Sequence, residues 1–193
     1  MQNKTEALIP GNIYHVYNRA NGSEKLFLIP GNYEYFLKKY WENIGPIADT
    51  FCYCLMPNHF HFVIKIKNME ELKLTLPGLE TLEGLAISKK LSKQFSNLFN
   101  GYTQAFNKQN QRMGSLFMQP YKRKLITSPA YLQEVICYIH NNPLSANLSK
   151  DLFKWPYNSY REIINGKTNN LSVSETINVF GDMEHFIKKH VGL

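Results

Sequence analysis

The sequence predicts an α+β protein with a ferredoxin-like, split βαβ antiparallel sheet and a short C-terminal helical extension. Segments with strand-like alternation and segments with helical spacing follow one another in the order β-α-β-β-α-β. The pair Pro57-Asn58 joins two of the strand-like segments, as a tight hairpin turn would. A chain of 193 residues is long enough for one full core and an appendage. We expect residues 1–148 to form the main domain and residues 149–193 an extension packed on or near it.

The first half supplies three strands and one helix. Ile13 to Arg19 alternates, with β-branched and aromatic residues, and predicts a strand. Residues 31–45 have helical apolar spacing, with Asn32 as the expected N-cap and Gly45 as the stop. Residues 47–56 and 59–67 predict two strands joined by the hairpin. Residues 68–86 carry four Glu, one Lys and a Pro-Gly break, and predict a long, mildly acidic excursion.

The second half supplies a long helix, an extended stretch and a third helix. Residues 88–107 place an apolar stripe on one helical face, and residues 116–127 are extended. Ser128-Pro129 opens the third helix, which we expect to end at Asn142-Pro143. Two short helical patterns follow, around residues 174–180 and 182–190.

The second strand of the hairpin carries two histidines, His59 and His61, on one face. Residues two apart in a strand point the same way, so these imidazoles share a face with Val63 and Lys65. The opposite face is a complete apolar set of Phe60, Phe62, Ile64 and Ile66. We therefore expect both imidazoles on a surface that the core does not need. Neutral imidazole is the commonest metal ligand, so the pair indicates half of a metal site.

The remaining ligands have two possible sources. In a two-residue hairpin, Cys54 lies opposite His61, so Cys52 and Cys54 could complete a structural zinc site, although the spacing differs from the usual knuckle. Alternatively, Tyr138 and Asn142 lie four apart on the third helix and so share one face. An amide oxygen could complete a two-histidine site, with the phenol beside the metal. That arrangement suggests a tyrosine nucleophile aimed at a metal-polarised phosphate.

The charge of the chain is concentrated in one segment. The net charge is +7, and residues 87–124 contain eight Lys or Arg but no Asp or Glu. Such a patch is typical of contact with a phosphate backbone, and the alternative is a solvated basic face. The candidate DNA-binding residues are Lys89, Lys93, Lys108, Arg112, Lys122, Arg123 and Lys124.

The motifs together resemble the single-tyrosine HUH transposases, most closely the REP-associated tyrosine transposase branch. 'YHVYNR' at 14–19, 'LMPNHFHFVI' at 55–64, 'YTQAFNKQ' at 102–109, 'GSLF' at 114–117, 'YIHNNP' at 138–143 and 'WPYNSY' at 155–160 follow the family's order and spacing. The resemblance covers nearly all of the chain. Histidine, a bulky apolar residue and histidine give the family its name, and 'HFH' at 59–61 matches.

The resemblance implies a metal-dependent single-stranded DNA endonuclease and strand transferase. Tyr138 would be the nucleophile, giving a 5′-phosphotyrosine, and His59, His61 and Asn142 would hold Mg²⁺ or Mn²⁺. His15 and Arg19 share a strand face and are candidates near the centre. The partner would be hairpin-containing single-stranded DNA. A monomer is favoured over a dimer, and the tyrosine could act in its own subunit or a partner's.

Two positions depart from the family pattern, and two other functions stay open. The insertion-sequence relatives have Gln at the position of Asn142, and the branch often has Arg where this chain has Pro120. The alternatives are a domesticated hairpin-binding protein that does not cleave and a replication-initiator relaxase. Without an apolar run of about 18 residues or a signal-peptide pattern, we expect a cytoplasmic protein with no membrane span. Three cysteines do not suggest a disulfide framework.

Overall fold

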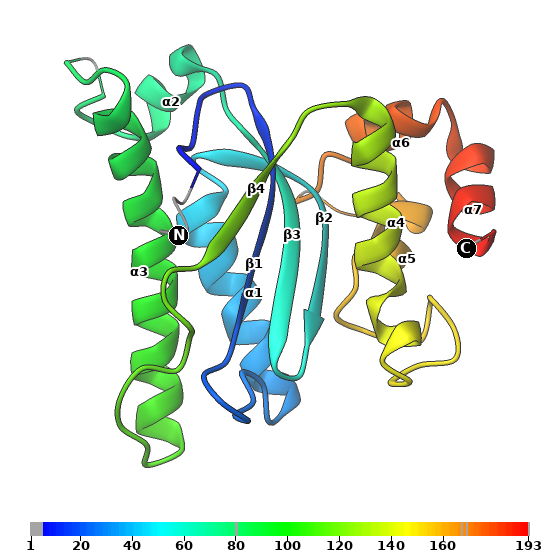
Figure 1. Ribbon diagram of the computed structural model, residues 1–193, viewed down its shortest axis with the longest axis horizontal. Helices are drawn as coiled ribbons and strands as arrows, with labels where there is room; N and C mark the ends of the chain where they lie inside the picture. The colour runs from blue at the N-terminus through cyan, green and yellow to red at the C-terminus, as the bar shows by residue number, and fades with distance from the viewer. Residues whose placement is uncertain (1–5, 80, 167, 169, 193) are drawn as a thin grey trace, which may run out of the picture.

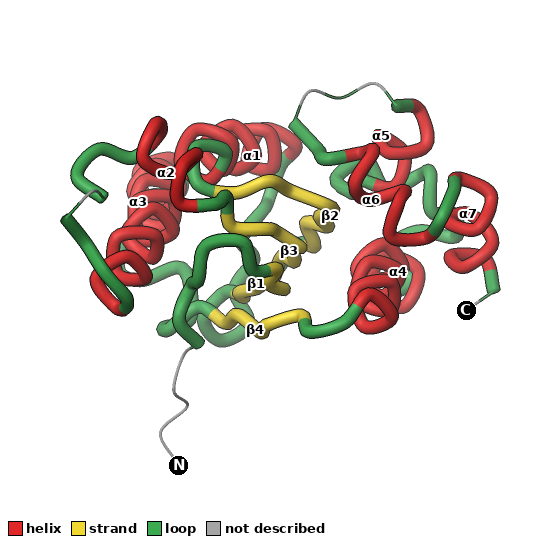
Figure 2. The backbone as a smooth tube through the Cα atoms, turned by 90° about the horizontal axis from the view of Figure 1, so that it is seen from above, coloured by secondary structure: helices red, strands yellow, loops and turns green. Residues whose placement is uncertain are grey.

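A four-stranded antiparallel sheet in the order β2-β3-β1-β4 organises the protein. The computed structural model describes residues 6–79, 81–166, 168 and 170–192. Figures 1 and 2 show α1 and α3 on one face of the sheet and α4 on the other. The elements are β1 Ile13–Arg19, α1 Pro30–Ile44, β2 Ala48–Met56, β3 His59–Ile66, α2 Met69–Thr75, α3 Leu85–Gln109, β4 Lys122–Ile126, α4 Pro129–Ser145, α5 Tyr160–Asn165, α6 Val173–Phe180 and α7 Met183–Val191. The predicted strand and helix order is confirmed.

The hairpin of β2 and β3 has the predicted register. Met56 pairs with His59 and Cys54 with His61, on either side of the Pro57-Asn58 turn. The predicted apolar face of β3 packs against α1: the Tyr40 and Phe62 rings stack 3.9 Å apart. This packing fixes which way β3 faces, because a one-residue slip would send the phenylalanines to the histidine side.

The histidine face of β3 is less open than predicted. Val63 on that face is fully buried, and His61 is only 7% exposed. The reason is α4, which lies across this face of the sheet (Figure 2). Both faces of β3 therefore contribute buried residues to the core, and α4 covers part of the histidine face.

Three predicted helix ends were wrong. The N-cap of α1 is Ile29, because Pro30 favours the first helical position; Asn32 instead accepts the backbone N–H of Leu28 at 3.0 Å. Helix α3 begins at Leu85 rather than at residue 88. Helix α4 runs through Pro143 to Ser145, because Ala146 N–H still donates to the Asn142 carbonyl at 3.0 Å. The stop at Gly45 is confirmed.

The acidic excursion contains one ordered element, α2. Asn68 and Glu71 form a reciprocal capping box, each side chain accepting the other's backbone N–H at 3.0 Å. Glu80, which belongs to the same excursion, lies outside the described residues, as do residues 1–5 of the expected main domain.

The C-terminal segment covers the outer edge of β2. Leu55 N–H donates to the Tyr157 carbonyl at 2.9 Å, and Ser159 N–H donates to the Tyr53 carbonyl at 3.1 Å. These bonds satisfy backbone groups that an edge strand would otherwise expose. Helices α6 and α7 match the predicted ranges within one residue, whereas the short α5 was not predicted. Among the described residues, no helix has the length and apolar character needed to cross a membrane.

Candidate functional site

The candidate site lies where α4 crosses the histidine face of the sheet. Strand β3 contributes His59 and His61, β1 contributes His15 and Arg19, and α4 contributes Tyr138 and Asn142. The Tyr138 ring lies 5.7 Å from the His61 ring and 6.5 Å from the His15 ring. Tyr138 is 54% exposed, although it sits on a helix whose neighbouring face is buried. The fold thus brings a reachable phenol next to two histidines that come from two different strands, β3 and β1.

Asn142 lies beside His59, as its position one turn beyond Tyr138 predicted. Its amide Nδ2 donates to the Tyr138 carbonyl at 2.8 Å, so the amide oxygen faces away from the helix backbone. Asn142 is also close enough to His59 to influence the pKa of its imidazole. His59 and His61 have ring centroids 5.1 Å apart. The four predicted residues His59, His61, Tyr138 and Asn142 are therefore brought together.

The histidines are held in the neutral form. Burial, with smaller contributions from His15 and His59, lowers the pKa of His61 to about 2. Burial and the nearby Lys124 lower the pKa of His15 to about 4. Burial lowers the pKa of His59, the nearby Asn142 partly offsets this, and Arg19 lowers the pKa slightly further. Neutral imidazole keeps one ring nitrogen with a lone pair, which is the form that binds metal ions.

The Nδ1 atom of each β3 histidine has a hydrogen-bond partner. His59 Nδ1 lies 2.7 Å from Asn58 Oδ1, so Nδ1 carries the proton and Nε2 keeps the lone pair. His61 Nδ1 lies 2.9 Å from His15 Nε2, so one of these nitrogens donates and the other accepts. If His61 donates, both β3 histidines present an unprotonated Nε2. This is the arrangement found in metal-binding histidines, whose other nitrogen donates to a neighbour.

The cysteines do not complete a zinc site. Cys52 and Cys54 are fully buried, and the Cys54 thiol contacts the Met56 sulfur at 3.7 Å. In the described part of the chain, no group of three or more His, Cys, Asp or Glu side chains is arranged to hold a metal ion. A three-donor site built on His59 and His61 would therefore need a ligand of another kind, for which the Asn142 amide is the candidate.

The three basic residues of β4 do not share one surface. Side chains alternate along β4, which pairs Lys122 with Tyr17, Arg123 with Val16 and Lys124 with His15. Lys122 and Lys124 thus face the histidine side. Arg123 faces α3, where its guanidinium bonds Ser92 Oγ at 2.9 Å and also reaches the Tyr121 hydroxyl.

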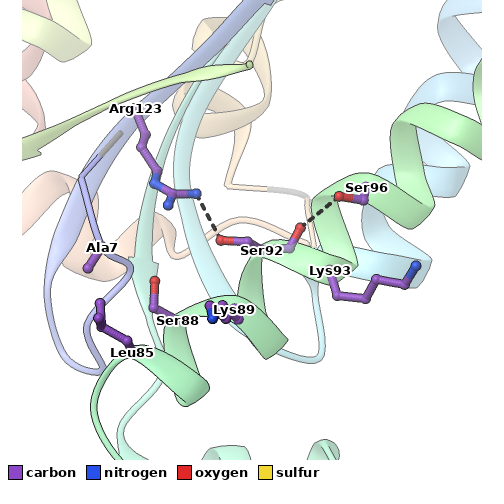
Figure 3. Close-up of a pocket in the computed structure, with 8 residues that line it drawn as sticks. All are labelled: Ala7, Leu85, Ser88, Lys89, Ser92, Lys93, Ser96 and Arg123. Atoms are coloured by element: carbon purple, nitrogen blue, oxygen red, sulfur yellow. Dashed lines mark hydrogen bonds between the residues drawn. The ribbon is translucent and has the colours of Figure 1, made fainter. Parts of the chain in front are cut away.

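The remaining basic candidates lie on or after α3. Lys89, Lys93 and Arg123 line a cavity of about 360 Å³ together with the hydroxyls of Ser88, Ser92 and Ser96 (Figure 3). Lys108 is exposed near the end of α3. Arg112 is used within the fold: its guanidinium pairs with Glu24 and bonds the Gly114 and Ser115 carbonyls.

Several residues near Tyr138 were not singled out from the sequence. Tyr131 and Glu134 lie with Tyr138 around one cleft, which Tyr17 also lines, with its ring 5.7 Å from the His61 ring. Spacing could have identified the first two, because they precede Tyr138 by seven and four residues on the same helix. Tyr17 lies on the same face of β1 as His15 and Arg19, so strand alternation could have identified it as well.

The comparisons with known proteins support the fold. No family model and no curated protein matches the sequence. A solved structure of a REP-associated tyrosine transposase bound to a REP hairpin is similar over 86% of this chain and 86% of that chain, with a TM-score of 0.62 and 12% sequence identity. At this identity the likeness is one of fold, and it confirms the predicted α+β class with its C-terminal helices.

Proposed function

We propose that this protein is a single-tyrosine HUH transposase, which cleaves and rejoins single-stranded DNA through a covalent tyrosyl link. The observation that carries the proposal is the meeting of Tyr138 with His59, His61 and Asn142 on a fold shared with a REP-associated tyrosine transposase. Tyr138 is 54% exposed beside the buried imidazoles of His15 and His61, so packing accounts for only part of its side chain. Its position suits attack on a phosphate bound at the same place.

The donor set fits a divalent cation. His59 and His61 each have a ring nitrogen bonded to a neighbour, which leaves the other for a ligand, and Asn142 adds an amide oxygen. Mg²⁺ or Mn²⁺ bound there would act as a Lewis acid that orients the phosphate and offsets its developing charge. His15 is the positioning residue of this set, since it fixes the ring and the tautomer of His61.

The reaction follows from the position of the phenol. Tyr138 Oη forms a bond to the phosphorus, the bond from phosphorus to the 3′ oxygen breaks, and the phenol proton is lost as the 3′ oxygen gains one. The products are a 5′-phosphotyrosine and a free 3′-OH. Because the phosphodiester is conserved in the link, attack by a 3′-OH rejoins the strand without a further energy source.

The DNA partner we propose is a hairpin with a single-stranded flank. The cavity between α3 and β4 is lined by the exposed Lys89 and Lys93, whose charges suit contact with a phosphate backbone that does not depend on base sequence (Figure 3). Lys122 and Lys124 flank Tyr138 on the other side of the sheet. A backbone bound to both regions would pass around the β4 edge.

The test uses a labelled DNA hairpin with a single-stranded flank and Mn²⁺. Wild-type protein is expected to form an adduct that survives denaturation, and Tyr138→Phe is expected to form none. Tyr35→Phe, on α1, is the matched control and should behave as wild type. Tight hairpin binding without an adduct in Mn²⁺ or Mg²⁺ would contradict the enzyme and favour a non-cleaving DNA-binding protein.

A further inference from the structure

Tyr138 stands between two clefts rather than at the end of one. The first has a volume of about 530 Å³ and lies toward His59, Arg19 and Lys122. The second has a volume of about 410 Å³ and lies toward His15, Tyr131 and Lys124. Tyr17, His61 and Tyr138 line both clefts and so form the wall between them.

Each cleft receives one lysine from β4. Lys122 and Lys124 are two residues apart on the same face of the strand, which separates their Cα atoms by about 7 Å. Tyr138 therefore borders one cleft that contains Lys122 and another that contains Lys124. A single strand of DNA that crosses Tyr138 would present one flank to each lysine.

The two clefts differ in chemistry. Among the described residues that line the first cleft are Arg19 and Lys122 but no carboxylate. The second combines Lys124 with the carboxylate of Glu134. Lys124 Nζ lies 4.9 Å from the centre of the Tyr131 ring, and the neighbouring Tyr131 raises the pKa of Lys124. A carboxylate repels an added phosphate but accepts a hydrogen bond from a hydroxyl.

We propose that the two clefts hold the two products of cleavage separately. The inference rests on the proposed function. The first cleft binds the strand whose 5′ phosphate becomes linked to Tyr138, with Lys122 and Arg19 at its backbone. The second cleft binds the strand that ends in the released 3′-OH, with Lys124 at its last phosphate and Glu134 at the hydroxyl. Holding that hydroxyl beside the phosphotyrosine favours rejoining over loss of the strand.

The test measures the binding of two short oligonucleotides to the Tyr138→Phe protein, so that no cleavage intervenes. One oligonucleotide begins with a 5′ phosphate and the other ends with a 3′-OH, and each matches one side of the cleavage point. Lys122→Ala is expected to weaken the first roughly fivefold, and Lys124→Ala to weaken the second by a similar factor. Lys38→Ala, a lysine exposed on α1, is the control and should change neither.

A second measurement concerns Glu134. Replacing the 3′-OH by a 3′-phosphate should weaken binding to the Tyr138→Phe protein, and adding Glu134→Gln should largely remove that discrimination. Equal effects of both lysine variants on both oligonucleotides, or an unchanged preference in Glu134→Gln, would overturn the two-cleft assignment. Failure of the wild-type protein to form any adduct would instead contradict the proposed cleavage, whatever the oligonucleotides do.

Discussion

Replacing His15 tests whether this residue prepares His61 for metal. His15 Nε2 lies 2.9 Å from His61 Nδ1, and both side chains are buried. His15→Phe keeps a ring of similar size but removes the acceptor. His61 must then leave its Nδ1–H unpaired or move the proton to Nε2, where the lone pair for a metal is needed. We expect weaker metal binding without a cavity in the core.

The magnitude follows from two estimates that agree. A buried donor left without a partner costs about 1–3 kcal/mol. Loss of an outer partner of a metal-binding histidine lowers metal affinity about 10–100-fold, which is roughly 1.4–2.7 kcal/mol. His15→Gln should recover much of the loss, because its amide oxygen can take the place of the ring nitrogen.

The assay is calorimetric titration of the DNA-free protein with Mn²⁺, accompanied by a thermal melt of each variant. Tyr35→Phe, a change at a half-buried aromatic residue away from the site, serves as the control. Mn²⁺ affinity in a folded His15→Phe protein within twofold of wild type would refute the assignment. Equal losses in His15→Phe and His15→Gln would also refute it, because the effect would then come from packing.

Three further predictions concern stability. Arg112→Ala should cost about 1–2 kcal/mol, by loss of the Glu24 pair and two carbonyl bonds, while hairpin affinity stays near wild type; urea melts and a binding titration check this. Phe36→Ala should cost about 3–5 kcal/mol in urea melts, since the ring is fully buried among other aromatics. Burial lowers the pKa of His190 to about 4, so below pH 6.5 the unfolded chain takes up a proton that the folded protein refuses. As the pH falls from 6.5 to 4, this residue should lower the free energy of unfolding by roughly 1.4 kcal/mol per pH unit. His190→Phe should make the dependence of stability on pH less steep, and it also removes the 2.8 Å hydrogen bond to His140. A slope unchanged in that variant would place the proton uptake elsewhere.

The strands were predictable because their signal is local. Alternation along 59–66 identifies the apolar face of β3, and the two-residue turn sets the pairing of Met56 with His59. Helix ends were less predictable, because several residues can cap the same turn. Asn32 is a residue type that often caps helices, but the helix begins two residues earlier, at Pro30. Pro143 removes only one hydrogen bond close to the end of α4, so the helix continues past it.

The candidate residues were also identified from the sequence, but their partners were not. Spacing alone places Tyr138 and Asn142 on one face of a helix, and His59 and His61 on one face of a strand. It does not say that His15 Nε2 reaches His61 Nδ1, because that contact needs β1 paired beside β3. Spacing also does not show that Arg112 forms an ion pair with Glu24, which lies 88 residues away in the chain.

The sequence by itself therefore determined the strand and helix order, the two-faced character of β3 and the choice of candidate side chains, since each depends on neighbours along the chain. Only the tertiary structure decided how those side chains are used. Packing α4 across the sheet buries His15 and His61, leaves Tyr138 exposed, and divides the surface around it into two clefts. The alternation along β4 likewise depends on the fold for its effect: it directs Arg123 to α3 and both lysines to the histidine face, where Lys122 lines one cleft and Lys124 the other. Burial and distance between remote segments are properties of the folded chain, and no local pattern contains them.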